Sequence, residues 1–323
     1  MLQLLSKIFR KRLLSGIILT VISFGGFLID IKDHTLFTSI FFGGAFYLGF
    51  MFIADWITIR FAGISIISSI YSNQKHKLRF TIATLVGGAL FGFMAADISG
   101  FFYFPYWSYS DYVIIGFILG GWTFYFLTVI IPYEATKVLL DKYFPFKKDI
   151  RRYFKWEKYA YLVFKYVSVI LFSAVILHVL IDTNFLSTFT FNQQIAKAPL
   201  VTHPYLTSFA FFASIVFFCE YIEYERKKSS LFKDIIHGYW NPLIALLIIG
   251  FLMGLTNEVQ NLGVFLWRYN NMPFADIQIF TIPLIVIISW PTHILAILEV
   301  WRAFGDKDSK IAFDITDPIK KNI

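Results

Sequence analysis

The sequence predicts an all-α, polytopic integral membrane protein in which about eight transmembrane helices form two parallel repeats of four. Three observations lead to this prediction. Charged residues make up 15% and hydrophobic residues 57% of the 323 residues, whereas a soluble domain has about 25% charged residues. Eight apolar stretches are long enough to cross a bilayer, and the two halves of the chain align with one another. We place the first repeat at residues 1–150 and the second, with a short cytoplasmic tail, at residues 151–323.

Each predicted helix has about 20 mainly apolar residues between polar breaks, which fits a hydrocarbon core about 30 Å thick. The first stretch follows four basic residues. We expect it to remain as a helix, because no small-residue cleavage site of the signal-peptide kind follows it. Two inner connections, 57–71 and 151–159, fit either interfacial helices or surface loops. The eight stretches are 13–28, 36–56, 80–98, 112–131, 159–181, 205–222, 240–255 and 277–298.

The basic residues predict the orientation of these helices. If the N-terminus is cytoplasmic, 25 of the 29 Lys and Arg residues fall in cytoplasmic segments and three, Lys32, Lys197 and Arg268, in outer loops, while Lys165 lies within the fifth stretch. This distribution follows the positive-inside rule and predicts a multi-pass protein of the cell membrane with both termini in the cytoplasm. The net charge of +8 is then a topological signal and a contact for anionic lipid, and no nucleic-acid partner is needed to explain it.

The two halves align at an offset near 160 residues. Because each half has four helices, both halves enter the membrane from the same side, and we expect an axis along the membrane normal to relate them. The matching glycines fit close helix packing better than a binding role. The equivalent positions are Asp55 and Glu220, Gly88–Gly92 and Gly250–Gly254, Trp107–Tyr109 and Trp267–Tyr269, and Pro132 and Pro291.

Acidic residues near the helix ends are the candidate catalytic groups. A charged side chain in a bilayer is costly, so intramembrane acids tend to be functional or paired. For each acid alone, a solvated helix end or a salt bridge is the simpler interpretation, and their recurrence at equivalent positions favours function. His293 stands in the second half where Glu134 stands in the first. The candidate acids are Glu134, Asp55, Glu220, Glu258 and Asp97.

Aromatic residues at the outer boundary are the candidate substrate-binding groups. Trp107, Tyr109, Trp267 and Tyr269 fit an aromatic belt or, together with His293, a binding surface for an apolar ligand. The single cysteine, Cys219, excludes an internal disulfide. The sequence has no nucleotide, zinc or di-iron motif, so no metal and no cofactor-binding residue is predicted, and the identity of any cofactor stays open.

The segment Phe104-Pro105-Tyr106-Trp107-Ser108-Tyr109, with Pro132-Tyr133-Glu134 a helix length further on, resembles the duplicated domain of the membrane-embedded lycopene cyclases of carotenoid biosynthesis. In that family a W-x-Y element precedes a helix that ends in P-x-E-E. Ala135 replaces the second glutamate here, and Thr292-His293 replaces the acidic pair in the second half. The resemblance implies a buried carboxylic acid that protonates a polyene, with Trp107, Trp267 and Tyr109 stabilising the carbocation.

The sequence therefore favours a membrane enzyme of isoprenoid, carotenoid or other lipid metabolism that uses buried carboxylic acids between the two repeats. A proton- or ion-coupled transporter with tandem repeats is the alternative, and a structural or assembly role is a third. Membrane lipids and a hydrophobic small molecule are the expected partners. The sequence specifies neither a substrate nor an oligomeric state.

Overall fold

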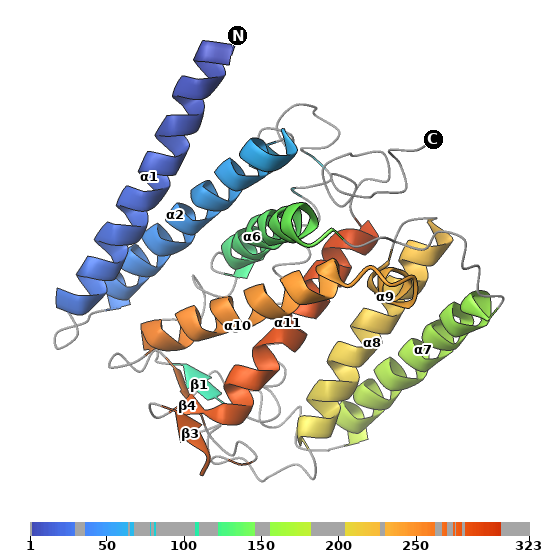
Figure 1. The fold of residues 1–323 in the computed structure, drawn as a ribbon. Helices are drawn as coiled ribbons and strands as arrows, with labels where there is room; N and C mark the ends of the chain where they lie inside the picture. The colour runs from blue at the N-terminus through green and yellow to red at the C-terminus, as the bar shows by residue number, and fades with distance from the viewer. Residues whose placement is uncertain are drawn as a thin grey trace.

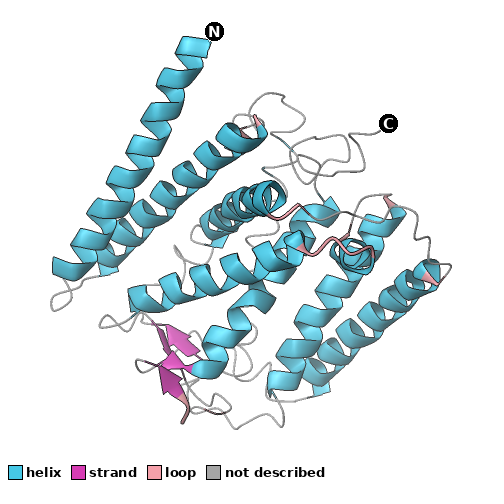
Figure 2. Cartoon of the chain, in the orientation of Figure 1, coloured by secondary structure: helices cyan, strands magenta, loops and turns pink. Residues whose placement is uncertain are grey.

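The structure is a computed structural model, and it describes residues 2–29, 36–63, 65–67, 78, 81, 107–109, 122–145, 156–181, 204–226, 230–261, 267–269, 274, 276–279 and 282–304. This part of the chain is almost entirely helical (Figures 1 and 2). The helices are α1 (Leu2–Ile29), α2 (Leu36–Ala62), α6 (Trp122–Tyr143), α7 (Glu157–Ile181), α8 (Pro204–Glu225), α9 (Leu231–Ile236), α10 (Asn241–Asn261) and α11 (Leu284–Phe304). The strands are β1 (Trp107–Tyr109), β2 (Trp267–Tyr269), β3 (Gln278–Ile279) and β4 (Ile282–Pro283).

Four of the described helices are long and apolar enough to cross a membrane. They contain the segments Phe41–Ala62, Glu157–Leu177, Asn241–Glu258 and Leu284–Ala303. The outer surface of α7 is apolar, since Tyr159, Tyr166 and Ile170 are 58–68% exposed. Water would penalise this surface, whereas lipid acyl chains would not. The chain therefore has the helices of a membrane protein.

The described helices overlap the predicted stretches, but several limits differ: α1 begins at Leu2 and not at residue 13, and α10 and α11 end at Asn261 and Phe304, each six residues later than predicted. The structure begins α11 at Leu284, seven residues later than predicted, because 278–279 and 282–283 form a β-hairpin. Pro283 lies just before the first turn of α11, where its missing N–H costs nothing. The helix α6 continues past Pro132 to Tyr143, although we predicted an end at residue 131. Similarly α2 continues through 57–62, the first part of the inner connection 57–71, and ends at Gly63, whose φ of 74° suits glycine. The predicted helix 80–98, apart from residue 81, lies outside the described residues, as do residues 112–121 and 151–155.

Neighbouring helices pack in a continuous series. The helix α1 packs on α2, α2 on α6, α6 on α10, α10 on α11, α11 on α8, and α8 on α7. Figure 1 shows α1 and α2 at one side of the molecule and α7 at the other. Buried apolar residues of α2, α6, α10 and α11 form the main core, with Met253, Ile294 and Val129 fully enclosed.

Two close approaches require glycine. A Cβ atom on Gly49 of α2 would lie 2.7 Å from the carbonyl oxygen of Gly16 on α1, and one on Gly250 of α10 would lie 2.6 Å from Cα of Pro291 on α11. Real Cβ atoms do not approach so closely, so both helix pairs depend on a missing side chain. The predicted packing role of Gly250 and Gly254 is confirmed, while Gly88 and Gly92 lie outside the described residues.

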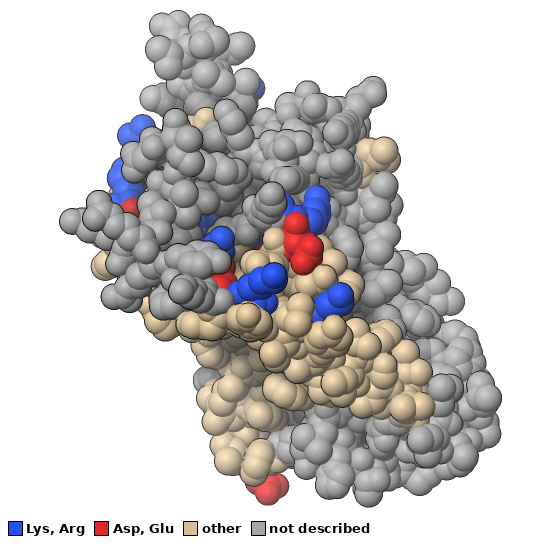
Figure 3. Space-filling model, turned by 90° about the vertical axis from the view of Figure 1, so that its right-hand side faces the viewer, with Lys and Arg blue, Asp and Glu red and all other residues tan. Residues whose placement is uncertain are grey.

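The described charges gather toward one end of the helices. In Figure 3, Lys, Arg, Asp and Glu side chains form a band across the upper half of the described surface, above a broad area without charge. The helices α2, α8 and α11 all end on the upper side of Figure 1, while the two small sheets lie at the lower side. The buried acids of α2, α8 and α11 lie near these upper ends.

Candidate functional site

Asp55 of α2 is completely buried and completely paired. The guanidinium group of Arg12 on α1 forms an ion pair with its carboxylate. Ser65 donates a hydrogen bond to the same carboxylate at 2.9 Å, and the backbone N–H of Ile67 donates another at 3.0 Å. Arg12 also donates to the hydroxyl oxygen of Ser65 at 2.8 Å. A buried ion pair with these additional hydrogen bonds fixes the chain after α2 against α1.

Glu220 of α8 is the residue that the sequence comparison matched with Asp55. One carboxylate oxygen, Oε1, accepts a hydrogen bond of 2.8 Å from the backbone N–H of Phe232, while Oε2 is buried and accepts none. Ser230 caps the N-terminus of α9 by accepting from Lys233 N at 3.1 Å. The hydroxyl groups of Ser230 and Tyr161 on α7 lie 2.5 Å apart.

The contacts of Asp55 and Glu220 follow one plan. In each half the acid accepts a hydrogen bond from the backbone N–H 12 residues later. In each half a serine ten residues after the acid contacts a side chain from the first helix, which is Arg12 for Ser65 and Tyr161 for Ser230. Every residue of the second set except Tyr161 follows its counterpart by 165 positions. The difference is in charge: Arg12 neutralises Asp55, whereas Tyr161 brings no charge to Glu220.

A second pair of equivalent contacts joins α6 and α11 to this plan. Glu134 Oε2 lies 3.3 Å from Nζ of Lys137, and Glu299 Oε1 lies 4.0 Å from Nη1 of Arg302. Both acids precede their base by three residues, and the two pairs are again 165 residues apart. All four side chains are at most 4% exposed. Thus Glu299, and not His293, has the contacts in the second half that Glu134 has in the first.

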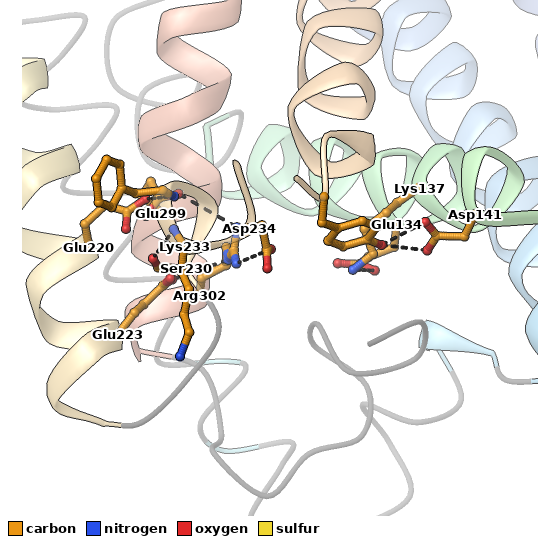
Figure 4. Close-up of polar contacts among 12 residues, drawn as sticks. Glu134, Lys137, Asp141, Glu220, Glu223, Ser230, Lys233, Asp234, Glu299 and Arg302 are labelled. Carbon is orange, nitrogen blue, oxygen red and sulfur yellow. Dashed lines mark hydrogen bonds and ion pairs between the residues drawn. The ribbon is translucent and has the colours of Figure 1, made fainter. Parts of the chain in front are cut away.

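Glu299 lies against two acids of α8. One carboxylate oxygen from each of Glu220, Glu223 and Glu299 can be chosen so that all three lie within 4.8 Å of one another. Neither oxygen of Glu299 accepts a hydrogen bond. Arg302 approaches from α11, with Nε 3.5 Å from Glu223 Oε1 and Nη2 3.6 Å from Asp234 Oδ2. Figure 4 shows these side chains converging between the ends of α8 and α11. We call Glu220, Glu223 and Glu299 the triple-glutamate cluster.

Two further polar contacts hold the surrounding helices. The hydroxyl of Tyr239 donates to both carboxylate oxygens of Asp141 at 2.8 Å, and Asn241 Nδ2 donates to Asp141 at 2.8 Å, which ties the end of α6 to the start of α10. Glu157 of α7 lies 3.5 Å from His237 Nε2 and 3.9 Å from Lys233 Nζ. Of these residues, Figure 4 labels Asp141, beside Glu134 and Lys137, and Lys233, beside Ser230.

The remaining predicted acids and His293 lie elsewhere. Glu258 is buried toward the other end of α10, where Trp290 Nε1 donates to it at 3.1 Å. The ring of His293 lies 4.5 Å from that of Phe212 and 5.6 Å from that of Trp290, measured between ring centroids. Asp97 lies outside the described residues. The structure therefore does not gather the four described acids into one site.

The predicted aromatic elements meet through their backbones. β1 and β2 pair antiparallel, with Trp107 opposite Tyr269, Ser108 opposite Arg268 and Tyr109 opposite Trp267. The two W-x-Y segments that we matched in the sequence are thus direct neighbours. The side chains of both strands lie outside what the structure describes.

Sequence reasoning missed Glu299, Arg302, Lys137 and Arg12 as site residues. A signal for three of them was present: Glu134 with Lys137, and Glu299 with Arg302, stand three apart inside otherwise apolar helices, and residues at this spacing share a helix face. Arg12 was counted only as a topological charge. No family model, no curated protein and no solved structure matches this chain.

Proposed function

We propose that this chain is an eight-helix membrane protein of two equivalent halves, and that it is an enzyme acting on an isoprenoid, carotenoid or other lipid. The repeated hydrogen bonds of Asp55 and Glu220, and the repeated pairs Glu134–Lys137 and Glu299–Arg302, support the duplication. Asp55, Ser65, Glu134 and Lys137 each match a polar residue 165 positions later in the chain. A chance alignment of apolar residues does not predict matching hydrogen bonds.

The ladder of β1 and β2 supports a two-fold relation between the halves. In an antiparallel pair, a local two-fold axis passes between two opposite residues, here Ser108 and Arg268. A rotation about this axis exchanges Trp107 with Trp267 and Tyr109 with Tyr269, which are the residues matched by the repeat. This exchange of matched residues supports the proposed repeat. Both termini lie in the cytoplasm in this proposal, as the basic residues predict.

The observation that carries the enzymatic proposal is the environment of Glu134. Its carboxyl group is 1% exposed, neither oxygen accepts a hydrogen bond, and the Lys137 ammonium group lies 3.3 Å away. Burial disfavours the charged carboxylate, so the Glu134 carboxyl group can hold a proton despite the nearby Lys137 and give it to a C=C bond. The negative charge that then develops on Glu134 is stabilised by Lys137. The lipid-facing surfaces of α7 and α10 are apolar, which suits a substrate delivered from the membrane.

The test is the identity of the lipids that copurify with the protein in mild detergent, measured by mass spectrometry for the wild type and for Glu134→Gln. Glu225→Gln, which changes an exposed acid at the end of α8, is the matched control. An isoprenoid or polyene that differs between wild type and Glu134→Gln, but not in the control, supports the enzyme. The same bulk phospholipids in all three proteins contradict it.

A proton- or ion-coupled transporter is the second candidate, and the triple-glutamate cluster favours it. Acids that bind and release a cation inside a membrane protein are a common element of coupled transport. In proteoliposomes, a transporter predicts a flux that responds to a proton or ion gradient and that Glu299→Gln abolishes. The enzyme predicts no such flux.

A further inference from the structure

We propose that Glu220, Glu223 and Glu299 form a binding site for one hard divalent cation, Mg²⁺, Mn²⁺ or Ca²⁺. The proposal goes beyond the lipid chemistry and does not depend on it. It requires only that α8 and α11 pack as the structure has them, since two ligands come from α8 and the third from α11.

The spacing of the three glutamates fits a single ion. Their nearest suitable oxygens lie within 4.8 Å of one another. Oxygen ligands of Mg²⁺ lie about 2.1 Å from the metal and those of Ca²⁺ about 2.4 Å, so two ligands of one ion are roughly 3 to 5 Å apart. Small side-chain rotations would bring all three carboxylates onto one ion. Water would complete a coordination shell of six or more oxygens.

Glu299 is the independent observation that points to a ligand. Its side chain is wholly buried and directed at the acids of α8, and neither of its oxygens accepts a hydrogen bond. Its ion pair with Arg302 is 4.0 Å long, at the outer limit of such contacts. Glu220 also has a buried oxygen, Oε2, without a hydrogen bond. Buried carboxylate oxygens normally have partners, and an ion at the centre of the cluster would serve both residues.

The charges in the two halves lead to the same inference. In the first half, Asp55 has Arg12 and Glu134 has Lys137, so each described acid of the plan has its own base. In the second half, among the described residues, Arg302 is the base that forms ion pairs with the cluster, through Glu223 and Glu299. It also pairs with Asp234. Buried charges of one sign require compensation. A divalent cation would add two positive charges beside the three carboxylates.

The ligand type decides which metals fit. Three carboxylates and no sulfur or imidazole ligand favour Mg²⁺, Mn²⁺ and Ca²⁺ over Zn²⁺ or Cu²⁺. Cys219, although it precedes Glu220 and is buried, does not belong to the group of potential ligands. Arg302 would sit in the outer shell, where its guanidinium group holds Glu223 at 3.5 Å. Such outer contacts orient metal-binding carboxylates.

The test uses the full chain in detergent micelles, treated with EDTA, and Mn²⁺ as the probe. Electron paramagnetic resonance measures free Mn²⁺ during a titration, and thermal unfolding is followed in parallel. We expect one Mn²⁺ per chain, competition by Mg²⁺ or Ca²⁺, and a higher Tm with the ion. Glu299→Gln and Glu223→Gln should each weaken Mn²⁺ binding at least tenfold and lose the rise in Tm.

Two controls keep the test decisive. Glu225→Gln changes an exposed acid on the same helix as Glu223 and should bind Mn²⁺ like the wild type. Glu157→Gln changes a buried acid that pairs with His237 outside the cluster, and it should also retain binding. Folding of each variant is verified by size-exclusion chromatography. Absence of stoichiometric Mn²⁺ binding in the wild type, or equal binding in a folded Glu299→Gln protein, would overturn the proposal. Neither result bears on Glu134 and the retained lipid.

Discussion

The guanidinium group of Arg12 on α1 forms an ion pair with the buried carboxylate of Asp55 on α2. The pair joins two helices whose backbones already approach closely at Gly16 and Gly49. Arg12 is 23% exposed while Asp55 is fully buried, so loss of the arginine leaves a buried negative charge without its base. Leaving one partner alone is the costly way to break such a pair.

We therefore expect Arg12→Met to destabilise the protein by about 2 kcal/mol, a value below the range for fully buried pairs because Arg12 keeps some contact with solvent. Thermal unfolding in detergent measures the loss as a lower Tm. Lys11→Met, a change at the exposed neighbouring position, should have little effect. The double variant Arg12→Met with Asp55→Asn should recover part of the loss, because no unpaired charge remains. Equal Tm values for Arg12→Met and Lys11→Met would contradict this prediction.

The effect on stability of replacing a helix glycine by alanine should depend on the atoms that the added Cβ would meet. Gly250→Ala places a methyl group 2.6 Å from Cα of Pro291, and we expect a loss of about 1 to 3 kcal/mol from overpacking. Gly44→Ala is the matched control, because nothing lies within 4 Å of the added Cβ. Alanine favours helices by up to about 1 kcal/mol over glycine, so this variant should be as stable as the wild type or more stable. Thermal unfolding of both variants makes the comparison, and a more stable Gly250→Ala would disprove the tight contact.

The serine that caps α9 offers a third prediction. Ser230→Ala removes the acceptor for Lys233 N and the partner of the Tyr161 hydroxyl. Loss of an N-cap costs about 1 kcal/mol, and the Tyr161 hydroxyl, left buried without its Ser230 partner, adds to this cost. Tyr161→Phe removes that hydroxyl but keeps the cap, so it should cost less than Ser230→Ala. Hydrogen exchange of the α9 amides, read by mass spectrometry, should rise in Ser230→Ala and stay low in Tyr161→Phe.

Membrane topology can be measured with single cysteines. Cys219 is the single cysteine of the sequence, so a Cys219→Ala background gives a protein without other thiols. Lys142→Cys at the end of α6 should react with a membrane-impermeant maleimide only after the cells are opened, and Asp276→Cys, next to β3, should react from outside. Both positions are exposed in the structure. Labelling of both from the same side would refute the predicted orientation.

Hydrophobicity along the sequence predicts where the described apolar helices lie, but it does not predict all of their limits. The end of α6 was wrong for a physical reason. Pro132, Glu134 and Lys137 together indicate a helix terminus, yet Glu134 and Lys137 pair within the helix and remain buried. The start of α11 was wrong because residues 278–283 are apolar enough for a membrane helix but form a hairpin.

The candidate site was predicted only in part. Asp55 and Glu220 were recognised as equivalent, and the structure gives them matching hydrogen bonds. Glu299 was not recognised, because its importance comes from contact with α8, whose acids lie far away in the sequence. An offset found from apolar residues also drifts, so it matched Glu134 with His293. The polar contacts instead pair residues at a constant offset of 165, which matches Glu134 with Glu299.

The unequal charge of the two acid–base groups has a consequence for how such a protein can be assembled. In a dimer of identical subunits, any change that removes a base from one site removes it from the other as well, so a surplus of buried acid would occur twice. When both halves belong to one chain, a change in one site leaves the other site unchanged. If the proposed duplication holds, one half has Arg12 beside Asp55 as a fixed anchor, while the other has the uncharged Tyr161 beside Ser230 and concentrates its acids around Glu299.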